Sequence, residues 1–140
     1  MTSPQQPGPL KVVVYSDDRT VRRAVITALG TRLDPDLPEL EFLEIATAPV
    51  VVRTADAGGV ALMILDGEAV PTGGLGLTRQ LKDEIYRCPP IMVIVGRPQD
   101  AWLATWSRAD AVSSHPIDAI ALADTVAKVL RRRTSVATTA

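Results

Sequence analysis

Three short runs of purely apolar residues limit the folds that this chain of 140 residues can adopt. They are Val12–Val14, Ala61–Leu65 and Ile91–Val95. Runs of this kind fit strands that are buried on both faces, as in a parallel sheet with helices on either side. Apolar residues make up 46% of the chain and aromatic residues only 4%, so the core between these layers must be aliphatic.

The segments between these runs alternate in the same way. Two further strands are expected over Glu41–Ala46 and Ala109–Ser113, and helices over Thr20–Arg32, from the Gly-rich loop to Tyr86, over Pro98–Arg108 and from Asp118 to Arg132. Residues 49–57 are ambiguous, and a short helix suits the connection better than a strand. The pattern predicts an α/β fold with a flavodoxin-like, doubly wound, five-stranded parallel sheet of order 2-1-3-4-5, covered by helices on both faces.

The folded domain is expected to span residues 10–132. Residues 1–9 are rich in Pro and Gln and predict a disordered segment, and residues 133–140 predict a flexible tail. The run Arg131–Arg133 fits the C-terminus of the last helix, where cations are favourable. Six residues are expected on the inner side of that helix: Ile120, Leu122, Ala123, Val126, Val129 and Leu130.

Charge and cysteine content exclude several classes of function. A net charge of −1 without a basic stripe argues against nucleic-acid binding. The single cysteine, Cys88, excludes an internal disulfide and a cysteine-based metal cluster. No secretory signal and no apolar run of about 18 residues is visible, so we expect a cytoplasmic protein without membrane insertion. High Ala, Val and Arg content indicates a high-GC bacterium, and we expect an actinobacterial source.

Acidic residues follow the first and third predicted strands. Asp17 and Asp18 come after strand 1, and Asp66 ends strand 3. Ligands of such folds bind at the carboxyl ends of these neighbouring strands. Clustered carboxylates repel one another, and magnesium relieves the repulsion, so these three are candidate magnesium ligands. Alternatively, Asp17 and Asp18 cap the first helix and Asp66 closes a turn.

Residues 10–132 resemble the receiver domain of bacterial response regulators. The resemblance is carried by the runs VVVYSDDRTVRRAV, ALMILDGEAVP, PPIMVIVGR and ADAVSSHP. It implies that Asp66 is the phosphoacceptor and that the peptide bond before Pro116 is cis.

Several positions depart from the family's pattern. Ser16 and Asp17 match the family's two acidic residues, although a slip of one residue would restore the pair as Asp17 and Asp18. Valine stands at two switch positions, since Val95 matches the switch hydroxyl residue and Val112 the switch aromatic. His115 matches the lysine that pairs with the phosphoryl group.

Two tryptophans are the candidates for binding a partner. Trp102 and Trp106 lie four residues apart and share a helix face, and Asp100 is placed to cap that helix. We expect one of the two rings in the core. In receivers the fourth helix, fifth strand and fifth helix form the usual partner surface, and the Gly-rich loop of residues 67–76 is a second candidate surface.

Three functional hypotheses follow. The favoured one is an atypical receiver without an output domain, which acts as a protein–protein interaction, regulatory or accessory module of a larger assembly, is not an enzyme, and does not depend on phosphorylation. The alternative is a functional single-domain response regulator that a histidine kinase phosphorylates on Asp66. A flavodoxin-like enzyme or cofactor binder is disfavoured because the acidic sequence Ser16-Asp17-Asp18 would repel an anion.

Overall fold

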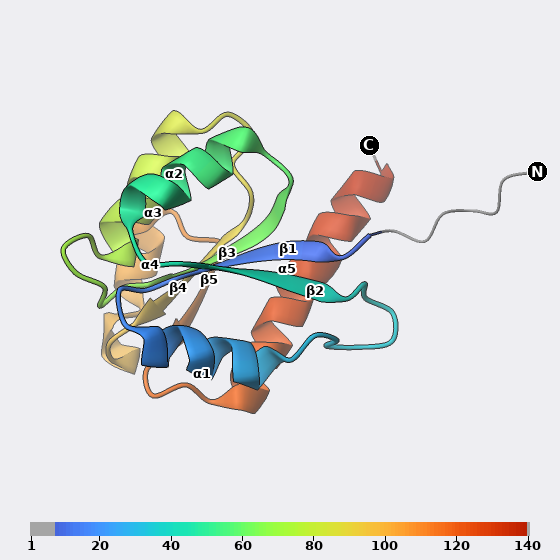
Figure 1. The fold of residues 1–140 in the computed structure, drawn as a ribbon, viewed down its shortest axis with the longest axis horizontal. Coiled ribbons are helices and arrows are strands. Elements are labelled where there is room, and N and C mark those ends of the chain that lie inside the picture. Colours follow the sequence, from blue (N-terminus) through green and yellow to red (C-terminus); the bar gives the residue numbers. More distant parts are fainter. Residues whose placement is uncertain (1–7, 140) are drawn as a thin grey trace, which may run out of the picture.

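The structure, a computed structural model, describes residues 8–139, with side chains described through residue 133. Its parallel sheet has the order β2-β1-β3-β4-β5 (Figure 1). The strands are β1 (Leu10–Tyr15), β2 (Leu40–Ile45), β3 (Val60–Asp66), β4 (Ile91–Val95) and β5 (Ala111–Ser114). The helices are α1 (Arg19–Leu29), α2 (Ala48–Ala57), α3 (Gly74–Glu84), α4 (Trp102–Ser107) and α5 (Ala119–Thr139), with a 3₁₀ turn, η1, at Pro98–Asp100. The predicted fold class and strand order are confirmed.

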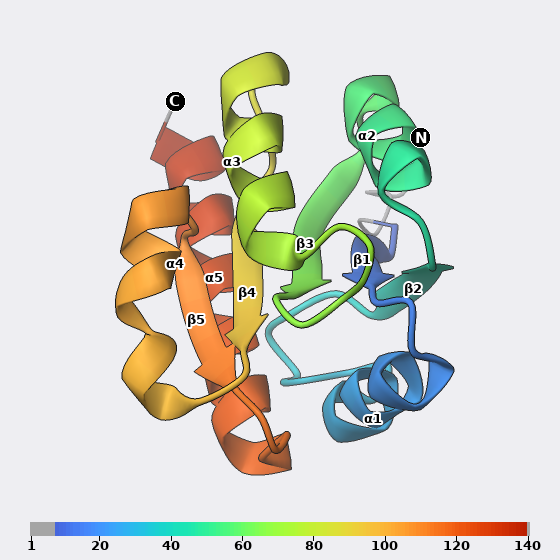
Figure 2. The same cartoon turned by 90° about the vertical axis from the view of Figure 1, so that its left-hand side faces the viewer.

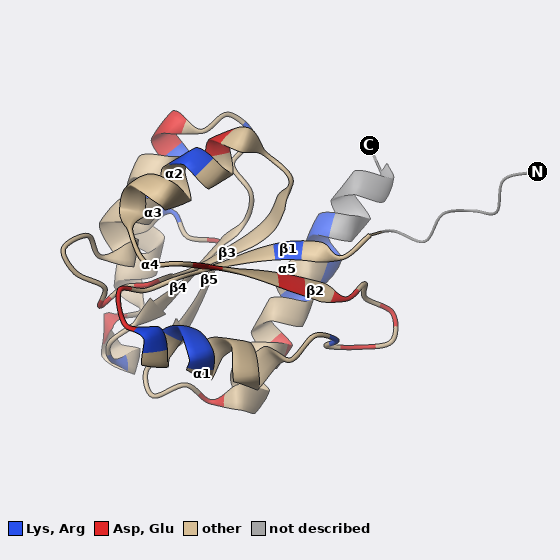
Figure 3. Ribbon diagram, viewed as in Figure 1, with Lys and Arg blue, Asp and Glu red and all other residues tan. Residues whose placement is uncertain are grey.

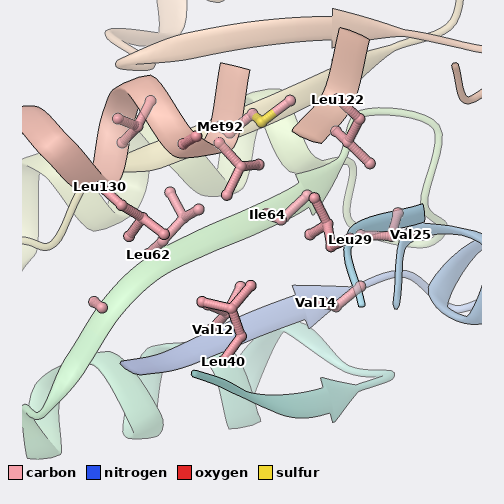
Figure 4. Close-up of a cluster of buried hydrophobic side chains, with 14 of the residues drawn as sticks. Val12, Val14, Val25, Leu29, Leu40, Leu62, Ile64, Met92, Leu122 and Leu130 are labelled. Carbon is pink, nitrogen blue, oxygen red and sulfur yellow. The ribbon is translucent and has the colours of Figure 1, made fainter. Parts of the chain in front are cut away.

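Alternate residues of β1 contribute to two separate cores because successive side chains of a strand point to opposite faces. Val12 and Val14 pack on the side of α1 and α5, with the labelled cluster of Figure 4. Val13 and Tyr15 pack on the side of α2 and α3. The two layers of helices therefore account for the purely apolar strands, and they leave the strand ends as the place where polar side chains gather.

The ends of the chain differ from the sequence expectation. The helix expected to end at Arg132 continues to Thr139, so Arg131–Arg133 does not mark a helix C-terminus. Arg131 instead pairs with Asp34 and Asp36 in the connection between α1 and β2. The predicted disorder of residues 1–7 falls outside the described residues, and the flexibility of residues 133–140 stays a prediction.

Ile120 does not belong to the inner side of α5. It is 86% exposed, whereas Leu122, Val126 and Leu130 are fully buried. Two residues correspond to about 200° around a helix, so Ile120 lies nearly opposite the stripe that Leu122 begins.

The expected helix over Pro98–Arg108 is divided into η1 and the six-residue α4. Asp100 does not cap α4, since its carboxylate accepts hydrogen bonds from Arg97, the residue before η1. The expectation of one tryptophan in the core is wrong, because Trp102 is 66% exposed and Trp106 is 51% exposed. The small residues Ala104 and Ser107 form the buried side of this short helix.

Acidic and basic residues are interspersed over the elements visible in Figure 3, in keeping with the net charge of −1. Among the described residues, no helix is both long enough and apolar enough to span a membrane.

Candidate functional site

The carboxyl ends of the parallel strands meet at one edge of the sheet, beside the loop between β3 and α3 (Figure 2). A cleft of about 580 Å³ opens there, and Asp66 and His115 both line it. Its lining is mainly acidic, since Arg97 and His115 face five carboxylates: Asp17, Asp18, Asp66, Glu68 and Asp100. The structure thus brings the predicted aspartates to the same cleft.

Asp66 is 3% exposed, and both of its carboxylate oxygens are engaged by the protein itself. Oδ2 accepts a hydrogen bond from the Ser16 hydroxyl at 2.8 Å. Oδ1 accepts one from the Glu68 backbone N–H at 2.9 Å and lies 3.1 Å from Nε2 of His115. A carboxylate can only accept, so Nε2 of His115 carries the proton in this contact. Three donors therefore satisfy Asp66 without any added ligand.

Ser16 is the centre of a small network at the end of β1. Its side chain is fully buried, and its Oγ accepts a hydrogen bond from the Asp18 backbone N–H at 3.0 Å while donating to Asp66. Its carbonyl accepts a 2.7 Å hydrogen bond from Arg22, whose guanidinium also pairs with Glu44. The hydroxyl is therefore oriented by partners on both sides.

Asp17 and Asp18 point to different partners. Asp18 is the N-cap of α1 and accepts a hydrogen bond from the Thr20 N–H at 2.8 Å, which agrees with the structural alternative for this residue. Asp17 accepts a 3.0 Å hydrogen bond from the Val70 N–H in the Gly-rich loop.

The Gly-rich loop is held at a second point by Tyr15, whose hydroxyl donates to the Thr72 carbonyl at 2.6 Å. Burial, and then the negative charges of Asp17 and Asp66, raise the pKa of the Tyr15 phenol above its usual value. Gly74 allows the loop to enter α3 beside Asp66, because a Cβ there would lie 2.8 Å from the Asp66 carbonyl oxygen. The loop that borders Asp66 is therefore fixed to β1 and β3.

The carboxylates do not offer magnesium a joint set of ligands in this arrangement. Within residues 8–133, no three His, Cys, Asp or Glu side chains gather closely enough to hold a metal ion. The Ser16 hydroxyl stands next to Asp66 and donates to it, and Asp18 caps a helix. Magnesium binding by Asp17, Asp18 and Asp66 stays a prediction. The three carboxylates, as they are arranged here, do not fit it.

The assignment of Val95, Val112 and His115 to the family's switch positions stays a prediction, and the structure shows where these residues lie. Val95 ends β4, and its aliphatic side chain is buried. Val112 of β5 is 36% exposed. His115 follows β5 and contacts Asp66, and the His115–Pro116 bond is cis, as the resemblance implies.

Two contacts, one in the cleft and one between α3 and α4, carry no signal in the sequence. The Glu68 side chain lies over Gly96, where a Cβ would collide with it, and so adds a negative charge next to Asp66. Arg79 of α3 places its guanidinium 4.6 Å from the centre of the Trp106 ring. Both contacts join residues that are distant in the chain, and no local pattern predicts them.

The comparisons with known proteins identify the family. No model of a protein family matches the chain. An uncharacterized response regulatory protein of Mycobacterium tuberculosis strain H37Rv is 55% identical over 128 residues, which cover 91% of this chain and 96% of that protein. The chain belongs to the response regulator family. The same degree of identity is found for a response regulatory protein of the strain CDC 1551, and both agree with the expected actinobacterial source.

Solved structures show that this response regulator has the receiver fold. A response regulator receiver domain protein from Clostridium thermocellum superposes with a TM-score of 0.72 at 18% identity, over 91% of this chain and 98% of that chain. A receiver domain protein from Methanospirillum hungatei gives a TM-score of 0.69 at 15% identity over the same shares.

Proposed function

We propose that this receiver is a constitutive binding module, a regulatory or accessory component of a larger protein assembly, whose docking does not require phosphorylation of Asp66. The observation that carries the proposal is that both oxygens of the Asp66 carboxylate are engaged, by Ser16, Glu68 and His115. On this proposal the protein acts through contacts rather than through catalysis.

A phosphoryl group on Asp66 would find few partners that differ between two states. The Val95 side chain has no polar hydrogen to donate, and Val112 has no ring to move inward. The carboxylate of Glu68 lies in the same cleft as Asp66 and would repel the added negative charge. A conformational equilibrium shifts only when a ligand interacts differently with the two states, so the residues present favour a single state.

The alternative is a working response regulator that a histidine kinase phosphorylates on Asp66. It is favoured by one observation, which is that Asp66 lines an open cleft at the position expected for the phosphoacceptor.

Amide NMR of the purified protein with magnesium, before and after addition of beryllofluoride, separates the two functions. We expect no shift changes in α4, with Asp66→Asn as the matched control that removes the acceptor. Intact mass after treatment with acetyl phosphate is expected to show no added phosphoryl group. Shift changes that reach residues 102–107, together with labelling that Asp66→Asn abolishes, would establish the alternative.

A further inference from the structure

Trp106 lies on the side of α4 that faces α3, and its ring is exposed like that of Trp102. The Arg79 guanidinium of α3 stacks over the Trp106 ring, which fixes the direction of that ring. Trp102 is one turn earlier on the same face. Figure 2 shows α3 and α4 side by side, with their starts at the same end of the molecule. This surface is therefore distinct from the one that α4, β5 and α5 form.

The tryptophan side of α4 is held in place before any partner arrives. Arg108, just after α4, pairs with Asp83 of α3, one helical turn beyond Arg79. The contacts Arg79–Trp106 and Asp83–Arg108 thus join two successive turns of α3 to the end of α4. Groups that are ordered in the free protein lose less conformational entropy on binding, and Trp and Arg are the residue types most often found at binding hot spots.

The charge of this surface is positive and unpaired. Among the described residues Arg79 forms no ion pair, and its guanidinium is exposed beside an aromatic ring. Gly76 lies one turn before Arg79, is exposed, and has open space where a Cβ would stand. Because α3 and α4 run in the same direction and Arg79 lies beside Trp106, Gly76 is expected beside the turn of α4 that contains Trp102.

We propose that Gly76, Arg79, Trp102 and Trp106, which we call the α3–α4 surface, bind an amphipathic helical segment of a partner protein. The partner segment carries two apolar side chains one turn apart, which pack on the two rings, and a carboxylate that pairs with Arg79. The side-chain-free position at Gly76 gives the partner's backbone room to approach α3. This inference rests on the proposed function and specifies its partner.

Selection from a library of displayed random peptides against the full chain tests the inference without knowledge of the partner. The expected peptides combine an acidic residue with apolar residues at helical spacing. Synthetic versions are expected to lose about tenfold or more in affinity on Trp106→Ala or Arg79→Ala, as hot-spot residues do. Arg79→Glu is expected to reverse the preference, so that the peptide with Lys in place of its acidic residue binds better.

Arg53→Glu is the matched control, because Arg53 is another exposed arginine, on α2, and the same charge change there should leave peptide binding unaltered. Circular dichroism confirms that each variant is folded. Selected peptides without acidic residues, or binding that Arg79→Glu leaves unchanged, would overturn the inference. Self-association of the chain that Arg79→Glu abolishes would also overturn it, because the occupant would then be a second copy.

Beryllofluoride distinguishes failure of this inference from failure of the proposed function. Peptide binding at the α3–α4 surface that appears only with beryllofluoride would overturn the constitutive function and leave the surface standing. No surface-dependent peptide, together with no response to beryllofluoride, would overturn the surface and leave the function standing.

Discussion

Replacing Ser16 with aspartate is expected to make the stability of the fold depend on a divalent cation. In the natural chain the Ser16 hydroxyl donates to Asp66 across 2.8 Å. Ser16→Asp removes that donor and places a second carboxylate at the same site. A divalent cation between the two carboxylates would relieve their repulsion.

The expected magnitude follows from the separation of the charges. Two carboxylates about 4 Å apart, in surroundings with an effective dielectric constant of about 20, repel by about 4 kcal/mol. The free energy of unfolding of Ser16→Asp should fall by an amount approaching this value when EDTA is present. A cation that binds with a Kd of about 1 mM restores about 1.4 kcal/mol when its concentration is about 10 mM.

Urea unfolding followed by circular dichroism, in EDTA and in magnesium at matched ionic strength, measures both effects. Ser16→Asn is the control, because it perturbs the same hydrogen bonds without adding a charge and should not respond to magnesium. If the natural chain gains as much stability from magnesium as Ser16→Asp does, the reasoning is refuted, because Asp17, Asp18 and Asp66 would then already form a site.

Three further predictions concern stability and titration. Gly76→Ala should raise the free energy of unfolding by about 0.5–1 kcal/mol in urea, since a Cβ there meets nothing within 4 Å. Gly74→Ala, in the same helix, should lower it by about 1–3 kcal/mol because its Cβ would crowd the backbone of β3; equal effects of the two would contradict the packing. Burial raises the pKa of the Cys88 thiol, so alkylation followed by mass spectrometry should be slower in the folded chain than in urea at pH 8, and a rate equal to that of the unfolded chain would speak against it. The raised pKa of Tyr15 means that the folded state keeps its proton longer, so this group's contribution to stability is present below pH 10.0 and is lost as the pH rises further. Phenolate absorbance should show a deprotonation step above pH 10.0 that Tyr15→Phe removes. If the step persists in the variant, it belongs to another tyrosine.

The sequence predicted those parts of the fold that depend on local pattern. The apolar runs of β1, β3 and β4 require burial on both faces, and that requirement leads to the sheet and its two layers of helices. The position of Asp66 follows because β3 ends there. These features depend on residues that are neighbours in the chain.

The errors arose where a contact between distant segments decides the outcome. Whether Trp106 is buried depends on the neighbouring helix, and α3 supplies a cation rather than an apolar pocket. Arg131 was expected to mark the end of the last helix, but its ion-pair partner lies in the connection before β2. A pattern within the helix does not reveal that partner. The hydrogen bond from Ser16 to Asp66 joins the ends of two strands, and only the register of the sheet brings them together.

Both tryptophans of the chain belong to α4, which gives optical experiments an uneven view of the molecule. Intrinsic fluorescence excited in the indole band reports on one helix of six residues at the surface, whereas circular dichroism averages over the whole backbone. Unfolding curves from the two signals coincide only if α4 melts together with the sheet. A fluorescence transition that comes first would reveal local opening of this helix, and a dye or labelled peptide bound beside it could be followed by energy transfer without adding any further probe to the protein.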